Sequence, residues 1–346
     1  MVEILTMWEF SINPESRTPK YKQIIDSVIN GIEKKQLHIG DKIPSINAIS
    51  ETYLLSRDTV EKAYSQLKEK KFITSVKGKG YFIANTDLVS KIHVCLIFNK
   101  LSPYKKMIYD SIVRGLGDTA YVDLYIHHCD PEIFDDLVTK KLEEYSYYVV
   151  MPNFHVIDER VKSTLKKIPD TELIILDRQI PELVGNFGNV YQDFRTDIYE
   201  ALTSSINDVK KYKKVYLVFP VNEVYPYPKE IILGFNDFVR QNSLEAQVMD
   251  DIEEDYEVNK GDLFIVIDEN DLINLIKAIR EKGLKTGDDV GIISYNETPL
   301  KEILENGITV MTTDFKAMGK AVANMIKSKK LIQEKNDFVF IERNSL

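Results

Sequence analysis

Cysteine is scarce in this chain of 346 residues, which has only Cys95 and Cys129, both in or next to apparent strands. A disulfide framework is therefore not expected, and buried thiols are the simpler interpretation. No uninterrupted apolar run reaches the length needed to cross a bilayer, and the N-terminus lacks the basic segment, apolar core and small-residue cleavage site of a signal peptide. These absences predict a cytoplasmic protein with no membrane partner.

Sequence signatures of catalysis are also missing. A dinucleotide-binding enzyme needs a glycine-rich turn after its first strand, and residues 98–102 contain no glycine. No spacing typical of a nucleophile with its base, and no Schiff-base lysine motif, is found. His127, His128 and Cys129 suggest a metal site, but neighbouring residues on a strand point to opposite faces and a fourth ligand is missing. We therefore expect no catalytic residue, no metal and no cofactor.

The two parts of the chain differ in charge. Residues 1–85 hold 13 Lys and Arg against 10 Asp and Glu, whereas residues 86–346 hold 32 against 44. Only the N-terminal part, with a net charge of +3, suits a polyanion. The length of the chain and its 44% of apolar residues predict two or three compact units.

Residues 45–71 have the pattern of a helix-turn-helix. Two short amphipathic stretches, residues 45–53 and 56–71, each begin with a serine, Ser45 or Ser56, whose hydroxyl can cap a helix N-terminus. Two leucines form the tight connection between the stretches. In the second stretch, apolar residues at helical spacing predict a buried face made of Val60, Ala63, Tyr64 and Leu67. The side chains that then face outward, where a major groove can meet them, are Arg57, Thr59 and Lys62.

The second stretch is followed by two short β-rich runs, residues 72–76 and 81–83, joined by a glycine turn. The turn carries Lys77 and Lys79 and therefore predicts a wing with a basic tip, suited to phosphates or the minor groove. For Arg57, Lys62, Lys77 and Lys79 taken one at a time, a solvated charged surface is the favoured interpretation. Their coincidence with a capped helix pair and a glycine wing favours DNA binding.

Further residues extend this pattern to residues 18–84, namely Pro19, Tyr21, Gln23, Ile24, Gly31, Leu37, Gly40, Asp41, Ile43 and Pro44. In spacing, the whole segment resembles the GntR family of bacterial transcription regulators. The pattern and the resemblance together predict DNA contacts at Ser45, Asn47, Ser56, Arg57, Asp58, Thr59, Lys62, Lys77, Gly78, Lys79 and Gly80. Asn47 stands where many members carry a base-contacting arginine, and Lys71 stands where a glycine usually ends the second helix. Because Asn47 can bond an adenine edge or a phosphate, the operator sequence does not carry over.

Residues 86–91 are polar, so we predict domains at residues 1–85 and 92–346 with a linker between them. Beyond the linker, apolar runs typical of strands alternate with amphipathic stretches such as residues 105–117 and 271–282. The strand candidates are residues 92–98, 122–127, 147–151, 173–176, 214–219, 263–267 and 290–294. This alternation predicts a doubly wound α/β unit of parallel sheets.

Polar and aromatic residues directly follow these runs, at residues 100–104, 153–155, 177–178, 191–193, 225–229, 270–271 and 295–297. Ligands of doubly wound sheets bind beyond the carboxyl ends of the strands. The mixture of carboxylates, amides, cations and rings suits a sugar, whose hydroxyls need polar partners and whose C–H faces lie on aromatic rings. Tyr104 and Phe154 are the candidates for such stacking.

The same region carries short motifs in a fixed order, namely residues 176–178, Val190 with Asp193, residues 234–235, 270–271, 283–296, 309–319 and 341–345. Their order and spacing resemble the effector domain of LacI/GalR regulators over residues 92–346. The resemblance implies a two-lobed periplasmic-binding-protein-like fold with effector contacts at Asp177, Arg178, Asn270 and Asn296. Asn296 stands where that family usually has aspartate. Ile231 stands where an arginine often clamps the ligand, and Lys229 is the candidate substitute.

These effector contacts also have plainer interpretations. Asp177 and Arg178 fit a surface ion pair that closes a strand, and Asn270 fits a helix cap with no ligand in reach. The order of the motifs, rather than any single residue, favours the effector site.

The predicted fold class is therefore α/β, with an N-terminal winged helix-turn-helix plus a two-lobed doubly wound α/β periplasmic-binding-protein-like domain. We expect a transcription regulator, a repressor, that binds a palindromic double-stranded DNA operator as a homodimer. Its effector is expected to be a small sugar, a monosaccharide or a deoxy sugar such as fucose. The alternatives are a ligand-free DNA-binding dimerisation scaffold and an α/β enzyme fused to a DNA reader.

Overall fold

The computed structural model describes residues 8–16, 18–86, 91–221 and 225–346. The chain divides into two compact units, Met1–Ile92 and His93–Leu346. Each unit has its own sheet structure and its own hydrophobic core. Most of the predicted linker, residues 87–90, lies outside the described residues.

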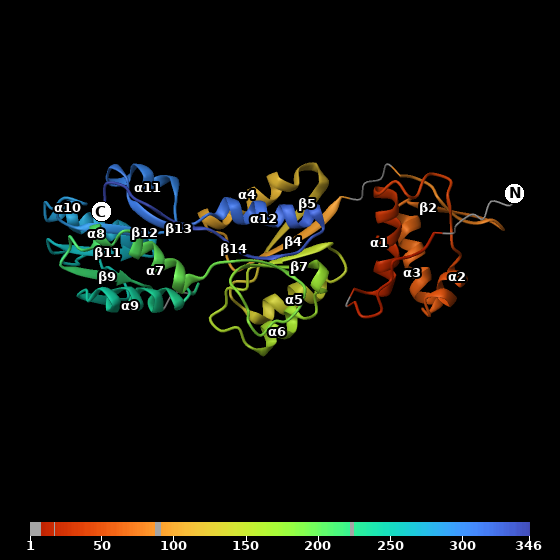
Figure 1. Ribbon diagram of the computed structural model, residues 1–346, viewed down its shortest axis with the longest axis horizontal. Coiled ribbons are helices and arrows are strands. Elements are labelled where there is room, and N and C mark those ends of the chain that lie inside the picture. The colour runs from red at the N-terminus through yellow and green to blue at the C-terminus, as the bar shows by residue number, and fades with distance from the viewer. Residues whose placement is uncertain (1–7, 17, 87–90, 222–224) are drawn as a thin grey trace. The chain divides into compact units, whose positions relative to one another are not determined.

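The first unit packs helices against a small antiparallel sheet of order β1-β3-β2 (Figure 1). Its elements are α1 (Lys20–Glu33), β1 (Lys42–Ile43), α2 (Ile46–Thr52), α3 (Arg57–Glu69), β2 (Ile73–Val76) and β3 (Gly80–Ile83). Both predicted helix caps are confirmed. The Ser45 hydroxyl accepts from the backbone N–H of Ala48 at 3.2 Å, and the Ser56 hydroxyl accepts from that of Thr59 at 3.3 Å.

The core of the first unit joins the buried face of α3 to α1 and to the sheet. The predicted face is confirmed, because the buried residues of α3 are Val60, Ala63, Tyr64 and Leu67. The Tyr64 hydroxyl donates to the carbonyl of Pro44 at 2.5 Å, which ties α3 to the segment before α2. Trp8, the single tryptophan of the chain, packs against this core at Gly31, where a Cβ atom would lie 2.6 Å from the indole ring.

The second unit has two lobes, each built on a six-stranded sheet between helices (Figure 1). In the first lobe the sheet order is β14-β8-β7-β6-β4-β5. These strands are β4 (Ile92–Phe98), β5 (Ala120–Ile126), β6 (Tyr147–Val150), β7 (Leu173–Asp177), β8 (Gly188–Tyr191) and β14 (Gln333–Lys335). Helices α4 (Pro103–Leu116) and α12 (Phe315–Ser328) pack side by side on one face, and α5 (Pro131–Lys141) and α6 (Glu159–Leu165) cover the other.

In the second lobe the sheet order is β10-β9-β11-β12-β13-β15. These strands are β9 (Lys214–Val218), β10 (Ala246–Met249), β11 (Asp262–Val266), β12 (Gly291–Tyr295), β13 (Thr309–Thr313) and β15 (Phe338–Ile341). The core on one face includes α7 (Phe194–Ser204), α8 (Ile206–Val209) and α9 (Glu230–Asn242), and the core on the other includes α10 (Glu269–Glu281). A short helix, α11 (Pro299–Ile303), follows β12. The doubly wound prediction is confirmed, with one difference: β15 pairs antiparallel to β13. β13 ends at one crossing between the lobes and β15 begins directly after another, so the two strands run in opposite directions.

The chain crosses between the lobes at residues 192–193, 314 and 336–337. Asn336 binds the three crossings together. Its backbone N–H donates to the carbonyl of Tyr191 at 2.7 Å, and its side-chain Nδ2 donates to Thr313 Oγ1 at 2.7 Å and to the Asp314 carbonyl at 3.0 Å. A single asparagine, through its backbone and side-chain amides, therefore connects the three crossings.

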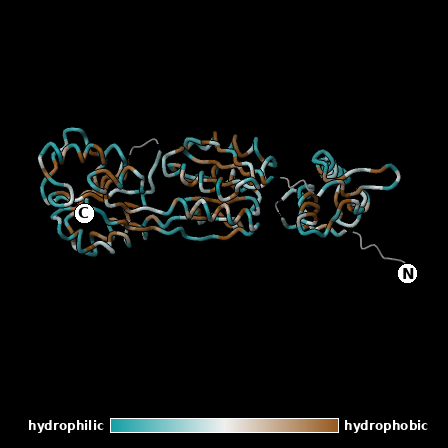
Figure 2. Tube along the Cα trace, turned by 90° about the horizontal axis from the view of Figure 1, so that it is seen from above, coloured by the Kyte–Doolittle hydropathy of each residue, from teal (hydrophilic) through white to brown (hydrophobic). Residues whose placement is uncertain are grey.

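Hydrophobic segments run through the interior of each lobe, with hydrophilic segments outside (Figure 2). Residues 94–98 of β4 are fully buried. Both cysteines are free and buried, as the sequence predicts. Across the residues described, no helix has both the length and the apolar character that a membrane span requires.

Candidate functional site

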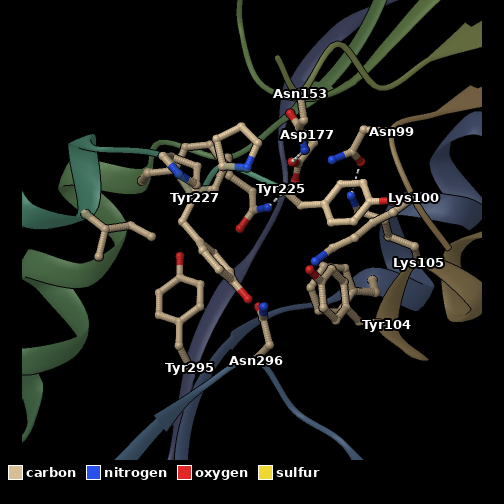
Figure 3. A pocket seen from close by; sticks show the side chains of 16 residues that line it. Asn99, Lys100, Tyr104, Lys105, Asn153, Asp177, Tyr225, Tyr227, Tyr295 and Asn296 are labelled. Atoms are coloured by element: carbon tan, nitrogen blue, oxygen red, sulfur yellow. Dashed lines mark hydrogen bonds between the residues drawn. The ribbon is translucent and has the colours of Figure 1, made fainter. Parts of the chain in front are cut away.

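A pocket opens between the two lobes, at the carboxyl ends of the strands (Figure 3). Its lining side chains are Asn99, Lys100, Tyr104, Lys105, Asn153, Asp177, Gln192, Phe194, Tyr225, Pro226, Tyr227, Pro228, Ile231, Tyr295, Asn296 and Phe315. The free space between them is about 40 Å³. Because each water molecule needs about 10–15 Å³ of such space, the cavity has room for a few waters. It is too small for a monosaccharide unless its walls move.

Asp177, the last residue of β7, is the centre of a hydrogen-bonded group on the first-lobe side. Asn153 Nδ2 donates to its Oδ2 at 2.6 Å, and Gln192 Nε2 donates to its Oδ1 at 2.5 Å. Asp177 is 8% exposed and has a φ of 77°, a left-handed conformation that is strained for a residue with a side chain. Strain of this kind is concentrated at functional sites.

The two amides that hold Asp177 leave their oxygens unsatisfied. A carboxylate only accepts hydrogen bonds, so each amide nitrogen must face Asp177 and each amide oxygen must face away from it. Within the described part of the chain, Asn153 Oδ1, Gln192 Oε1 and the Tyr295 hydroxyl are buried and have no hydrogen-bond partner. All three residues line the pocket. An unpaired buried polar group costs about 1–3 kcal/mol.

Lys105 places a buried cation at the pocket. It lies in the first turn of α4, where the Ser102 hydroxyl accepts from its backbone N–H at 3.4 Å, and it is 3% exposed. Its ammonium donates to Asn99 Oδ1 (Figure 3). Burial lowers the pKa of Lys105 to about 8, and the nearby Asp177 carboxylate opposes this shift. The protein therefore holds a partly desolvated cation here.

On the second-lobe side, Asn296 follows β12 with a φ of 64°. Lys301, which is 3% exposed, fixes this turn because its ammonium donates to the carbonyls of Tyr295 at 3.0 Å and Asn296 at 2.8 Å. Burial lowers the pKa of Lys301 to about 8. Lys301 does not line the pocket itself, so its effect on the pocket is to position Asn296.

Aromatic rings close the pocket from both lobes. Tyr104 stacks on Phe315, with ring centroids 5.0 Å apart and planes at 28°. Tyr225 comes from the other lobe, and its ring lies 4.6 Å from the ammonium of Lys100. Its hydroxyl is 3.2 Å from Nδ1 of His128. Tyr225 therefore fills space between the lobes that a ligand would use.

The structure brings together three of the seven predicted effector residues, Tyr104, Asp177 and Asn296. The other four do not line the pocket. Phe154 is 3% exposed and packs in the core of the first lobe, 4.3 Å from the His127 ring, so it offers no surface for stacking. Arg178 is half-buried and does not line the pocket. Lys229 is exposed and directly precedes α9. Asn270 is exposed in the first turn of α10, a helix whose N-terminus is capped by Asp268.

Several lining residues were not among the predicted contacts. Lys100, Asn153, Tyr225 and Tyr227 follow predicted strands, and Gln192 lies in the predicted polar segment at residues 191–193, so position alone could have indicated them. Asn99 directly follows the predicted strand at residues 92–98 and carried the same signal, whereas Lys105 had none. Lys105 lies on a helix, and nothing in the sequence distinguishes it from the exposed Lys106 beside it.

The predicted DNA-contacting residues lie on the first unit and are mostly exposed. Those with exposed side chains are Ser45, Asn47, Ser56, Arg57, Asp58, Lys62, Lys77 and Lys79. Arg57 Nε is 2.9 Å from Glu61 Oε1, one helical turn further along α3. The Lys62 ammonium lies 3.8 Å from the centroid of the Tyr21 ring on α1. Gly78 and Gly80 have φ values of 76° and 113°, so the wing turn needs their glycines.

In comparison with known proteins, a different family model matches each of the two units. Residues 20–83 match the family described as "Bacterial regulatory proteins, gntR family", and residues 210–337 match a "Periplasmic binding protein-like domain". The HTH-type transcriptional repressor YtrA of Bacillus subtilis (strain 168) is 36% identical over 105 residues, which are 30% of this chain and 80% of that protein.

Two further similarities extend over the second unit. The arabinose metabolism transcriptional repressor of Geobacillus stearothermophilus is 19% identical over 90% of this chain and 91% of its own length. A solved structure of a periplasmic binding protein/LacI transcriptional regulator from Alkaliphilus metalliredigens QYMF, in complex with D-xylulofuranose, has a TM-score of 0.56 at 14% identity. It covers 74% of this chain and 99% of that one. At this identity the likeness concerns the fold.

Proposed function

The chain belongs to the GntR family of bacterial regulatory proteins, and from this premise we propose that it is a transcriptional repressor controlled by a small sugar. In this proposal the first unit binds an operator, and the pocket of the second unit binds the sugar. The similarity to a repressor of arabinose metabolism supports the proposed role as a repressor. The likeness to a LacI transcriptional regulator structure in complex with D-xylulofuranose supports the proposed sugar. The proposed location is the cytoplasm, where bacterial DNA is accessible.

The observation that carries the sugar site is the group of unsatisfied polar atoms at the pocket. The amide oxygens of Asn153 and Gln192 need donors, and the Tyr295 hydroxyl can donate or accept. Sugar hydroxyls do both, so a small polyol has the donors and acceptors that these three atoms need. The ring of Tyr104, held by Phe315, offers a flat apolar surface for the C–H face of the sugar.

On the DNA side, we propose that Asn47, Arg57 and Thr59 meet base edges or phosphates in a major groove. Asn47 and Arg57 are exposed, and all three are near the capped N-termini of α2 and α3. Lys77 and Lys79 of the wing would contact phosphates or the minor groove. A homodimer on a palindromic operator follows from the usual pairing of helix-turn-helix readers with half-sites one DNA turn apart.

The proposed coupling uses the hinge of the second unit. A sugar bound between the lobes contacts both of them, and it favours the lobe angle that fits it best. A change of angle requires movement of the three crossings that Asn336 holds together. Regulation needs only about 1–3 kcal/mol of coupling between sugar and operator binding.

The test combines two measurements on the full chain. Thermal unfolding is followed against neutral sugars, deoxy sugars including fucose, and sugar acids, since a ligand at a hundredfold excess over Kd stabilises the native state by about 2.7 kcal/mol. DNA fragments selected from a random pool are then titrated with and without the stabilising sugar. We expect that one sugar class stabilises the second unit and weakens DNA binding.

Asn153→Ala should abolish sugar binding, and Asn270→Ala, at the exposed position outside the pocket, should leave it intact. Stabilisation by no compound, together with normal DNA binding, would favour a ligand-free scaffold. Consumption of the sugar would favour an enzyme.

A further inference from the structure

We infer that the effector is a sugar bearing an anionic group, which binds beside Lys105 and Lys100 at the first-lobe end of the pocket. The inference rests on the proposed function and narrows its ligand class. The shared chemistry is an oxyanion, either the carboxylate of a sugar acid or the phosphate of a sugar phosphate.

The first support is the charge of the lining. Of the 16 side chains that line the pocket, three carry a formal charge, Lys100, Lys105 and Asp177. They leave one positive charge in excess. A neutral sugar would leave this charge buried beneath it, whereas a carboxylate neutralises it.

The second support is that Asp177 does not neutralise Lys105 directly. Among the described residues no ion pair within 4.0 Å joins the two, and both carboxylate oxygens of Asp177 already accept from the amides of Asn153 and Gln192. Asn99 Oδ1 is the acceptor found for the Lys105 ammonium, which has three N–H donors. Because Lys105 is 3% exposed, its remaining donors need a partner within the pocket.

The third support comes from the helices that begin at the pocket. Phe194 and Phe315 line it as the first residues of α7 and α12, whose N-termini are capped by carboxylates, Asp193 and Asp314. The N-terminus of α4 is capped instead by the neutral Ser102, so its partial positive charge adds to that of Lys105 in the same turn.

Lys100 supplies the second cation. Its ammonium lies 4.6 Å from the centre of the Tyr225 ring, a contact between the lobes. Tyr225 occupies space that a sugar needs, and an oxyanion is a stronger partner for an ammonium than the face of a ring. The bound anion would therefore take Lys100 away from Tyr225, which weakens the hold on that side chain and leaves its contact with His128. Ligand entry and the rearrangement of the lobes would then be one event.

The test compares each anionic sugar with its neutral parent by calorimetric titration of the full chain. The pairs are galacturonate with galactose, glucuronate with glucose, gluconate with glucitol, and glucose 6-phosphate with glucose. We expect one anionic member to bind at least about thirtyfold more tightly than its parent, which corresponds to the low end of the loss when a buried charge pair is broken. The affinities of the sugar acids and of the sugar phosphate show whether the site binds a carboxylate or a phosphate.

Lys105→Met keeps the aliphatic length and removes the charge. It should reduce the preference for the anion sharply, to the part that Lys100 still supplies, and Lys106→Met, at the exposed neighbour on α4, should leave the preference unchanged. A neutral parent that binds as tightly as its anion overturns the inference and leaves the sugar sensor standing. Binding by none of the compounds counts against the sensor itself, and the inference fails with it. The comparison in the wild-type chain decides the question even if the variant does not fold.

Discussion

Asn153 and Asp177 lie at the ends of neighbouring strands, and the amide Nδ2 of the first donates to Oδ2 of the second at 2.6 Å. This bond fixes the orientation of the Asn153 side chain and turns its Oδ1 away from the carboxylate. Gln192 is held in the same way from the other side. Asp177 therefore acts on the pocket mainly by orienting two acceptors, and a direct contact with the ligand is not required for it to matter.

Asp177→Ala should abolish this orientation, because both amides lose their acceptor and turn freely. We expect the affinity for the effector to fall by at least about tenfold, the order expected when buried hydrogen-bonding groups are left without partners. DNA binding without effector should not change. The measurement is calorimetric titration for the sugar and fluorescence anisotropy for the DNA. Unchanged sugar affinity in Asp177→Ala would show that the two amides are held by other contacts.

Arg57→Ala should have the opposite profile. Arg57 and Glu61 are 67% and 47% exposed, so the loss of their ion pair should cost less than about 0.5 kcal/mol of stability. DNA affinity should fall strongly while sugar affinity is retained. If Arg57 contacts a phosphate, the dependence of log K on log salt should also become shallower by about one unit. Lys68→Ala, an exposed change in the last turn of α3, is the control, and an equal loss of DNA affinity in it would count against a specific role for Arg57.

Lys71→Gly should stabilise the first unit. Lys71 follows α3 with a φ of 60°, the left-handed position that usually carries glycine at a helix end. Removing its Cβ relieves about 1–2 kcal/mol of strain, part of which is offset by the greater freedom of glycine in the unfolded chain. A net gain of about 0.5–1 kcal/mol is expected.

The fluorescence of Trp8 reports this gain, because the only tryptophan of the chain packs in the core of the first unit. Urea unfolding followed at this probe therefore measures that unit. Lys70→Gly is the matched control, since Lys70 has a φ of −77° and glycine there should destabilise. A loss of stability in Lys71→Gly would mean that the lysine side chain makes a favourable contact that outweighs the strain.

The fold was predictable from sequence where local patterns decide it. Apolar spacing and two serine caps predict α2 and α3, and alternating runs predict the sheets of the second unit. The antiparallel β15 was not predictable, because its pairing depends on a chain that leaves the lobe and returns. Likewise Asp177 and Asn296 could be found from position in a motif, whereas Lys105 becomes part of the pocket only through the packing of α4. Phe154 was wrongly expected at the ligand because a residue that follows a strand can also turn back into the core.

His127 should make the stability of the second unit depend on pH. Burial lowers its pKa to about 4 from 6.5, and its Nε2 lies 3.1 Å from the Met151 carbonyl, a hydrogen bond that opposes the shift. Between these pH values the unfolded chain takes up a proton that the folded chain rejects. The stability from His127 is therefore complete above about pH 6.5 and decreases as the pH falls toward 4, by about 1.4 kcal/mol per pH unit.

Urea unfolding followed by far-ultraviolet circular dichroism at pH 7.5 and 5.5 tests this dependence. His127→Gln removes the titrating group and retains a donor for the Met151 carbonyl, so its stability should change less between the two pH values than that of the wild type. His93→Gln, at an exposed histidine of the same unit, should behave like the wild type. Carboxylates also begin to titrate near the lower pH, and they do so equally in all three proteins, so the difference between variants isolates His127. Parallel pH profiles for His127→Gln and the wild type would show that the folded lobe accepts the proton, for example by opening the core around Phe134 and Phe154 that encloses the ring.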